Sequence, residues 1–353
     1  MEVVAGVLYH FIGGFSSGSF YLPYKKVRGW SWESYWLFGG LFSWLIVPWV
    51  AAILTVPEYD RIIADAPLTT LLWTYVMGLL WGIGGLTFGL SMRYLGLSLG
   101  MSIALGFCSA FGALIPPIYR DVTGRDGETL SAMFGSAGGQ LVLLGVIVCL
   151  AGIAICGRAG MLKEREVSEA DKRAVIAEFN LPLGLAVATL SGILSACFNF
   201  GIEAGQPLAQ LAVERGTDPL FQNNVVFVVL LWGGLTTNVI WCLVLNARNR
   251  TFGDYARQDA PLRRNYLFCS LAGTIWFLQF FFYGMGASKL SNGASSWILH
   301  MAFIILISNA WGIALGEWRG VSRRTLRVIL FGIATILLSV VVVGYGNSLP
   351  GAG

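Results

Sequence analysis

Ten long apolar stretches, separated by short polar segments, dominate the pattern of the chain. Each is long enough to cross the hydrocarbon core of a bilayer, which takes about 20 residues of helix. The runs are continuous rather than alternating, so they predict helices and not a barrel of strands. We expect the spans at 4–23, 35–56, 70–91, 98–119, 138–157, 181–203, 220–245, 266–287, 291–315 and 326–346.

The composition agrees with this pattern and narrows the class of protein. The 353 residues are 56% hydrophobic and only 12% charged, whereas a soluble domain carries about 25% charged residues. The six cysteines show no metal-ligand spacing, and no nucleotide-binding P-loop occurs. We therefore expect an all-α integral membrane protein whose main partner is the lipid bilayer. We expect no catalytic residues, no metal, no cofactor and no nucleic-acid partner.

The positive charges predict how the helices are oriented. An even number of spans places both termini on one side of the membrane. Basic residues concentrate in connections that stay inside the cell. Of the 23 Lys and Arg residues, only five fall on the side of the termini. Both termini should therefore face outward. The five residues are Arg61, Arg120, Arg125, Arg215 and Lys289.

The longest polar segment, 159–180, is expected to be a cytoplasmic connector between two units, 1–158 and 181–353, of five spans each. An odd number of spans per unit would insert the second unit upside down, which is a frequent plan of secondary transporters. Chance similarity between small, apolar helices is the alternative to a repeat. The matching positions are Gly6, Gly14, Ser17 and Phe20 with Gly184, Gly192, Ser195 and Phe198, and Trp81 and Gly89 with Trp276 and Gly284.

The stretch 276–303 carries the strongest candidates for a functional site. Polar side chains at membrane depth are costly and usually mark the path of a substrate or ion. Gln279 and Tyr283 share one helix face, and Trp297 lies one turn before His300. An amide and a phenol form hydrogen bonds without charge, as a neutral polyol requires.

Three aromatic residues and an asparagine complete the predicted sugar site. Trp276, Trp297 and Tyr21 are candidates for stacking on the apolar face of a sugar, and Asn199 is a second amide inside a span. Each has a simpler alternative. Tryptophan and tyrosine gather at membrane interfaces, and a lone amide often joins two helices by hydrogen bonds.

Three residues are candidates for proton coupling. His10 and His300, the two histidines of the chain, lie several residues inside their spans, and imidazole titrates near neutral pH. Their alternative role is a hydrogen bond to a neighbouring helix. Glu33 opens the second span near Lys26, with which it is a candidate cytoplasmic gate or structural pair. Its alternative role is that of a first-turn carboxylate favoured by the helix dipole.

Several motifs occur in order along most of the chain. They are F-Y-L-P-Y-K-K-V-R-G-W-S-W-E at 20–33, W-G-I-G at 81–84, G-L-S-M-R-Y-L-G-L-S-L-G at 89–100, R-A-G-M-L-K-E-R at 158–165, E-F-N at 178–180, W-F-L-Q-F-F-F-Y at 276–283, S-W-I-L-H-M at 296–301 and E-W at 317–318. In combination they resemble the bacterial L-rhamnose–proton symporter family of the drug/metabolite transporter superfamily.

The resemblance implies ten helices in two inverted five-helix repeats, with both termini in the periplasm. It also implies uptake of a deoxy-sugar, most simply L-rhamnose, with a proton across the bacterial inner membrane by alternating access. Transport of another sugar or small polar metabolite, or a sensor that does not transport, are the alternatives.

Overall fold

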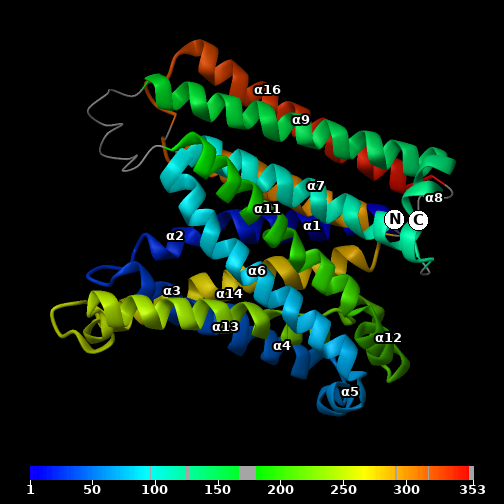
Figure 1. Ribbon diagram of the computed structural model, residues 1–353, viewed down its shortest axis with the longest axis horizontal. Helices are drawn as coiled ribbons and strands as arrows, with labels where there is room; N and C mark the ends of the chain where they lie inside the picture. The colour runs from blue at the N-terminus through cyan, green and yellow to red at the C-terminus, as the bar shows by residue number, and fades with distance from the viewer. Residues whose placement is uncertain (96, 125–126, 167–179, 291, 317, 350–353) are drawn as a thin grey trace.

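The protein is a bundle of long helices in a computed structural model that describes residues 1–95, 97–124, 127–166, 180–290, 292–316 and 318–349 (Figure 1). These residues contain no strand, and ten of their helical segments are long and apolar enough to cross a membrane, which confirms the predicted fold class. The helices are α1 (Glu2–Ser19), α2 (Tyr21–Tyr24), α3 (Trp32–Leu41), η1 (Phe42–Ile46), α4 (Val47–Thr55), α5 (Tyr59–Asp65), α6 (Leu68–Leu95), α7 (Leu97–Thr123), α8 (Leu130–Gly135), α9 (Ala137–Glu166), α11 (Leu181–Ala204), α12 (Gln206–Glu214), η2 (Pro219–Phe221), α13 (Asn224–Asn249), η3 (Phe252–Ala256), α14 (Leu262–Ala287), α15 (Gly293–Ala314) and α16 (Arg323–Asn347).

Several helices continue beyond the spans expected from hydropathy. The fifth span was expected to end at residue 157, but α9 continues to Glu166. Its last turn carries Lys163 and Arg165, and long basic side chains of this kind favour a membrane surface while the backbone keeps its helical hydrogen bonds. The first residues of the expected connector 159–180 therefore belong to α9. Positions 167–179, and the motif residues 178–179 and 317, lie outside the described residues.

Both ends of the chain lie at the same end of the bundle, here called the terminal end (Figure 1). The short helices α5, α8 and α12 lie at this end as well. The connection 25–31 lies at the other end, here called the opposite end. There Asn265 exchanges hydrogen bonds with the backbone of Arg28. Both termini at one end of the bundle are what an even number of spans requires.

Two helices occupy matching places in the packing. The first, α1, packs against α14 and α15, and α11 packs against α6 and α7. Glycines allow the close approach. A Cβ added at Gly14 would lie 2.3 Å from Phe303 Cβ on α15, and one added at Gly192 would lie 2.5 Å from Phe107 Cβ on α7. No side chain fits at either position without a shift of the neighbouring helix.

An ion pair joins α7 and α11 at the terminal end. Arg120 of α7 pairs with Glu203 of α11, and Arg120 also donates to the backbone oxygen of Glu128 at 3.0 Å. Glu128 lies between two spans, and both of its carboxylate oxygens are shielded from solvent. Burial raises the pKa of the Glu128 carboxyl to about 8, although the Arg120 guanidinium acts against this.

Close packing at the two glycines predicts a loss of stability on small substitutions. Gly14→Ala and Gly192→Ala should each lower the free energy of unfolding by about 1–3 kcal/mol, because the new methyl group overlaps a neighbouring helix. Thermal unfolding in detergent measures the change. Gly85→Ala is the matched control, since a Cβ at Gly85 meets nothing within 4 Å. Equal melting temperatures for all three variants would contradict the packing.

The buried Glu128 carboxyl predicts that stability depends on pH. A carboxyl whose pKa is raised by folding stabilises the fold most in acid, and this contribution is lost as the pH rises through about 8. The melting temperature should therefore fall between about pH 5 and pH 8 and level off above pH 8, and Glu128→Gln should remove much of that fall. Glu58→Gln at the same end, where the side chain is exposed, should keep it. An unchanged pH profile in Glu128→Gln would show that this carboxyl is not the cause.

Candidate functional site

Three predicted residues meet in the half of the bundle nearer the termini. The imidazole of His10 on α1 lies 5.3 Å from the ring of Tyr283 on α14, measured between centroids. The His300 ring on α15 lies 5.1 Å from Tyr283 and 6.3 Å from His10. All three side chains are buried. Helices far apart in the sequence thus bring both histidines to one tyrosine, here called the histidine cluster.

Glycines make room for the two imidazoles. A Cβ added at Gly286 would lie 2.8 Å from the His10 ring, and one added at Gly13 would lie 3.5 Å from the His300 ring and 2.8 Å from the backbone oxygen of Gln279. The rings therefore lie against bare backbone on the neighbouring helices. This close contact fixes their position where α1, α14 and α15 meet.

The ring nitrogens of the histidine cluster have no hydrogen-bond partner. Within the described part of the chain, Nδ1 and Nε2 of both His10 and His300 are buried and unpaired. A buried polar group without a partner costs about 1–3 kcal/mol, so native proteins seldom keep one without a functional reason. In each neutral ring, one nitrogen can therefore accept a proton, and the N–H of the other can donate to a polar ligand.

Asn199 and Trp297 join helices beside the cluster. Pro116 within α7 has no N–H to offer the carbonyl four residues earlier, which is that of Gly112. Asn199 Nδ2 donates to this oxygen at 2.8 Å, and Asn199 Oδ1 accepts the Tyr283 hydroxyl at 3.2 Å. Asn199 thus makes the interhelical bonds that were its alternative role, and it also holds Tyr283 in place.

Trp297 is held in the same way. Its Nε1 donates to the backbone oxygen of Cys108 on α7 at 3.0 Å, and a Cβ at Gly112 would lie 2.0 Å from that nitrogen. The Trp297 ring lies 6.1 Å from that of Tyr283. Trp297 therefore forms a wall of the histidine cluster, with its polar atom already bonded to α7.

Gln279 and Trp276 extend the site toward the opposite end. The Gln279 side chain is buried and donates to the Trp276 backbone oxygen on its own helix at 2.9 Å. The Trp276 ring lies 5.2 Å from Phe280, which in turn lies 6.0 Å from His300. A continuous row of aromatic rings thus connects the histidine cluster to Trp276.

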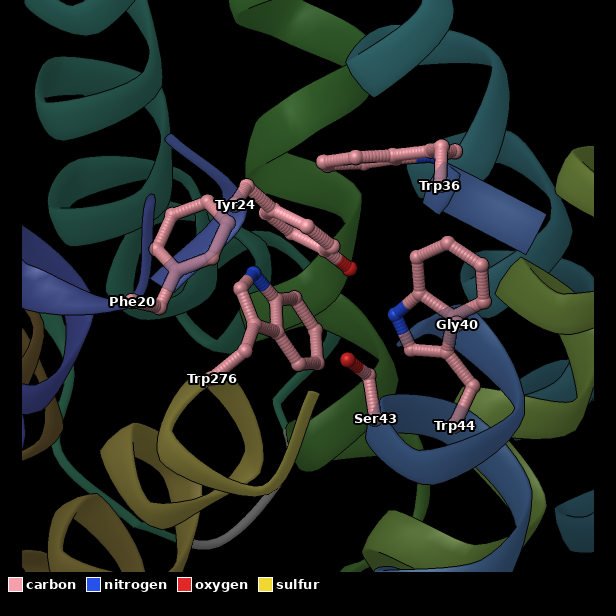
Figure 2. Close-up of a pocket in the computed structure, with 7 residues that line it drawn as sticks. All are labelled: Phe20, Tyr24, Trp36, Gly40, Ser43, Trp44 and Trp276. Carbon is pink, nitrogen blue, oxygen red and sulfur yellow. The ribbon is translucent and has the colours of Figure 1, made fainter. Parts of the chain in front are cut away.

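Trp276 also borders a narrow pocket, which we call the aromatic pocket (Figure 2). The side chains leave only a narrow gap between them, with no room for a water molecule. The sequence analysis singled out Trp276 but not the other residues that line the pocket. Two consecutive glycines, Gly39 and Gly40, and a serine, Ser43, inside an apolar span could have indicated this pocket from the sequence. The lining consists of Phe20, Tyr24, Trp36, Trp44 and Trp276, together with Gly40 and Ser43.

The remaining predicted residues lie away from the cluster, at the opposite end. Tyr21 is 40% exposed, and its hydroxyl shares a hydrogen bond with that of Tyr35. Lys26 is exposed. The buried Glu33 carboxylate accepts hydrogen bonds from Asn249 Nδ2 at 2.9 Å and Thr251 Oγ1 at 2.8 Å.

Glu33 therefore ties the start of α3 to the connection that follows α13. Among the ion pairs of the described residues, none joins Lys26 to Glu33. The described residues also contain no group of three or more His, Cys, Asp or Glu placed to hold a metal ion.

Comparison with known proteins places this arrangement in a family. The family model for the L-rhamnose-proton symport protein (RhaT) matches residues 1–349. The chain is 38% identical over 349 residues to the L-rhamnose-proton symporter of Cronobacter sakazakii, with 98% of each chain covered. The corresponding proteins of Pectobacterium carotovorum and Citrobacter koseri are 37% and 36% identical over 349 residues, with the same coverage.

The match covers nearly the whole length of this chain and of its relatives. It includes every helix that contributes to the histidine cluster and the aromatic pocket. The ten apolar helices agree with a multi-pass protein of the bacterial inner membrane. The chain therefore belongs to the L-rhamnose–proton symport protein family.

Proposed function

We propose that this protein takes up L-rhamnose together with a proton across the bacterial inner membrane by alternating access. The names of its relatives support this substrate and this ion. The observation in the structure that carries the proposal is the histidine cluster. Two titratable side chains lie buried in a membrane bundle with unpaired nitrogens, and both contact the same tyrosine. Such groups are costly in a membrane and typical of proton paths.

We propose that the two units, 1–158 and 181–353, are inverted repeats, with both termini in the periplasm. Matching contacts support this. A Cβ at Gly6 would lie 2.9 Å from the Leu290 side chain, and one at Gly184 would lie 2.5 Å from that of Leu95. Leu95 and Leu290 keep the same spacing along the sequence as the matching tryptophans, and Gly6 and Gly184 keep the spacing of Gly14 and Gly192.

The matching tryptophans also support a pseudo-two-fold axis. Trp81 and Trp276 hold corresponding places in the two units, and their rings lie 5.7 Å apart. Equivalent residues contact each other only beside the axis that relates them. The periplasmic position of the termini rests on the basic residues, which gather in the connections of the opposite end.

In this proposal, protonation of a histidine weakens the packing of α1 against α14 and α15. A proton on either imidazole places a positive charge where the protein supplies no counter-charge within the cluster. The charged cluster is stable only when the site is open to water or to the hydroxyl groups of a sugar. After the proton leaves on the cytoplasmic side, the neutral rings pack together again. Sugar and proton thus favour the same open state.

Sugar accumulation driven by a pH gradient tests the proposed function. In proteoliposomes, a gradient of one pH unit, acidic outside, corresponds to about a tenfold concentration ratio for each proton carried. The wild type should therefore accumulate labelled L-rhamnose about 10-fold. Uptake that ignores the gradient would contradict proton coupling, and absence of uptake in both conditions would contradict the substrate.

The histidine cluster predicts variants that exchange sugar without accumulating it. His300→Gln and His10→Gln keep a polar side chain of similar size but remove the titratable group. Each should reduce gradient-driven accumulation from about 10-fold toward 1-fold, while exchange of labelled for unlabelled L-rhamnose continues. Asn309→Ala is the control on α15, because that amide bonds only to its own helix, and it should accumulate sugar normally. Normal accumulation in both histidine variants would remove the cluster from the coupling mechanism.

A further inference from the structure

The aromatic pocket lies outside the histidine cluster and between three elements. Phe20 and Tyr24 come from the first span, Trp36 and Trp44 from the second, and Trp276 from α14. The space between them is too narrow for a water molecule. Polar atoms nevertheless point into this gap between aromatic rings (Figure 2).

One polar atom of the pocket has no partner. Trp44 is only 3% exposed. Its Nε1–H is buried and has no hydrogen-bond partner among the described residues. Figure 2 shows this nitrogen and the hydroxyl groups of Tyr24 and Ser43 pointing toward one another across the gap. An indole N–H can only donate. Only a hydrogen-bond acceptor can therefore pair with this nitrogen.

A break in the regular helix aims Ser43 and Trp44 at the pocket. They lie in the π-helical turn η1, where the Val47 N–H bonds to the Phe42 oxygen five residues earlier. Pro48 follows, and it has no N–H for the Trp44 carbonyl. Ser43 Oγ lies 3.2 Å from both the Gly39 and Gly273 oxygens. Single π-turns of this kind are frequent at functional sites.

Two consecutive glycines on α3 allow the rings of Tyr24 and Trp44 to lie directly against the helix backbone. A Cβ at Gly39 would lie 1.8 Å from the Tyr24 hydroxyl oxygen, and one at Gly40 would lie 2.3 Å from the Trp44 ring. The rings thus lie directly on helix backbone. No side chain at either position would leave the pocket in its present form.

The lining selects the chemical class of the ligand. It contains no charged side chain, so it offers nothing to neutralise a phosphate, a carboxylate or a cation. Flat aromatic walls with a few polar groups are typical of sites for small neutral molecules. A pyranose presents apolar C–H faces to such walls and hydroxyl groups at its edge.

We propose that the aromatic pocket is a subsite for a neutral monosaccharide, and that Trp44 Nε1–H donates a hydrogen bond to one of its hydroxyl oxygens. This inference rests on the proposed function and adds residues to it. The pocket is closed in this structure, so the proposal requires Trp44, carried by the π-helical turn, to move away from Tyr24 when the sugar binds. Trp276, which touches both Trp44 and Phe280, links the filling of the pocket to the histidine cluster.

Equilibrium binding of labelled L-rhamnose to the purified full chain tests the subsite. Trp44→Phe keeps an aromatic ring and removes the N–H, so it should raise the dissociation constant about 3- to 10-fold, the value of one hydrogen bond. Trp49→Phe is the matched control on the same span. Its Nε1 is also buried and unpaired, but its ring packs on Tyr59 and Trp232 outside the pocket. It should change binding by less than about 2-fold.

Two further arms complete the test. Ser43→Ala should also weaken binding, which provides a second variant in case Trp44→Phe has a folding defect. Unlabelled glucuronate, which is charged, should not displace the sugar. Equal affinity in the wild type, Trp44→Phe and Ser43→Ala would overturn the subsite while the proposed function stands. Displacement by glucuronate as effective as that by L-rhamnose would overturn the neutral ligand class. A wild type that neither binds nor transports L-rhamnose would overturn the proposed function and this inference with it.

Discussion

Lipid offers no hydrogen bonds, and this constraint governs where the polar groups of the bundle find partners. Most of them are satisfied within the protein. The Gly112 carbonyl, which Pro116 leaves open, receives the Asn199 amide. The nitrogens of His10 and His300, and that of Trp44, are left unpaired beside side chains of other helices. In the proposed mechanism the bonded groups hold the bundle together, and the unpaired nitrogens of these three residues are available to a passing proton or sugar.

The unpaired groups are ordered along the bundle. The histidine cluster lies nearer the terminal end, and the aromatic pocket lies nearer the opposite end. Phe280 and Trp276 connect them through direct ring contacts. In the proposed mechanism, these ring contacts transmit movement at either site to the other. The Arg120–Glu203 ion pair closes the terminal end, while Glu33 anchors the opposite end through α13.

Hydropathy predicted the ten helices well, because twenty apolar residues in sequence leave few alternatives to a membrane helix. The cost of burying a polar group likewise singled out His10, Tyr283 and His300, and the structure brings these three together. The structural roles of Asn199 and Glu33 depend on partners distant in the sequence, so only the fold assigns them. Trp44 escaped prediction because its significance comes from a π-turn and from a missing partner. Neither of these can be read from a tryptophan in an apolar run.

The most direct experiment follows proton and sugar movement in the same vesicles. Proteoliposomes that contain a pH-sensitive dye should acidify inside when L-rhamnose is added outside in the absence of a gradient, because each sugar brings a proton with it. The doubly substituted protein, His10→Gln with His300→Gln, should exchange labelled L-rhamnose without any acidification. Acidification of undiminished size in that double variant would contradict proton coupling through the histidine cluster.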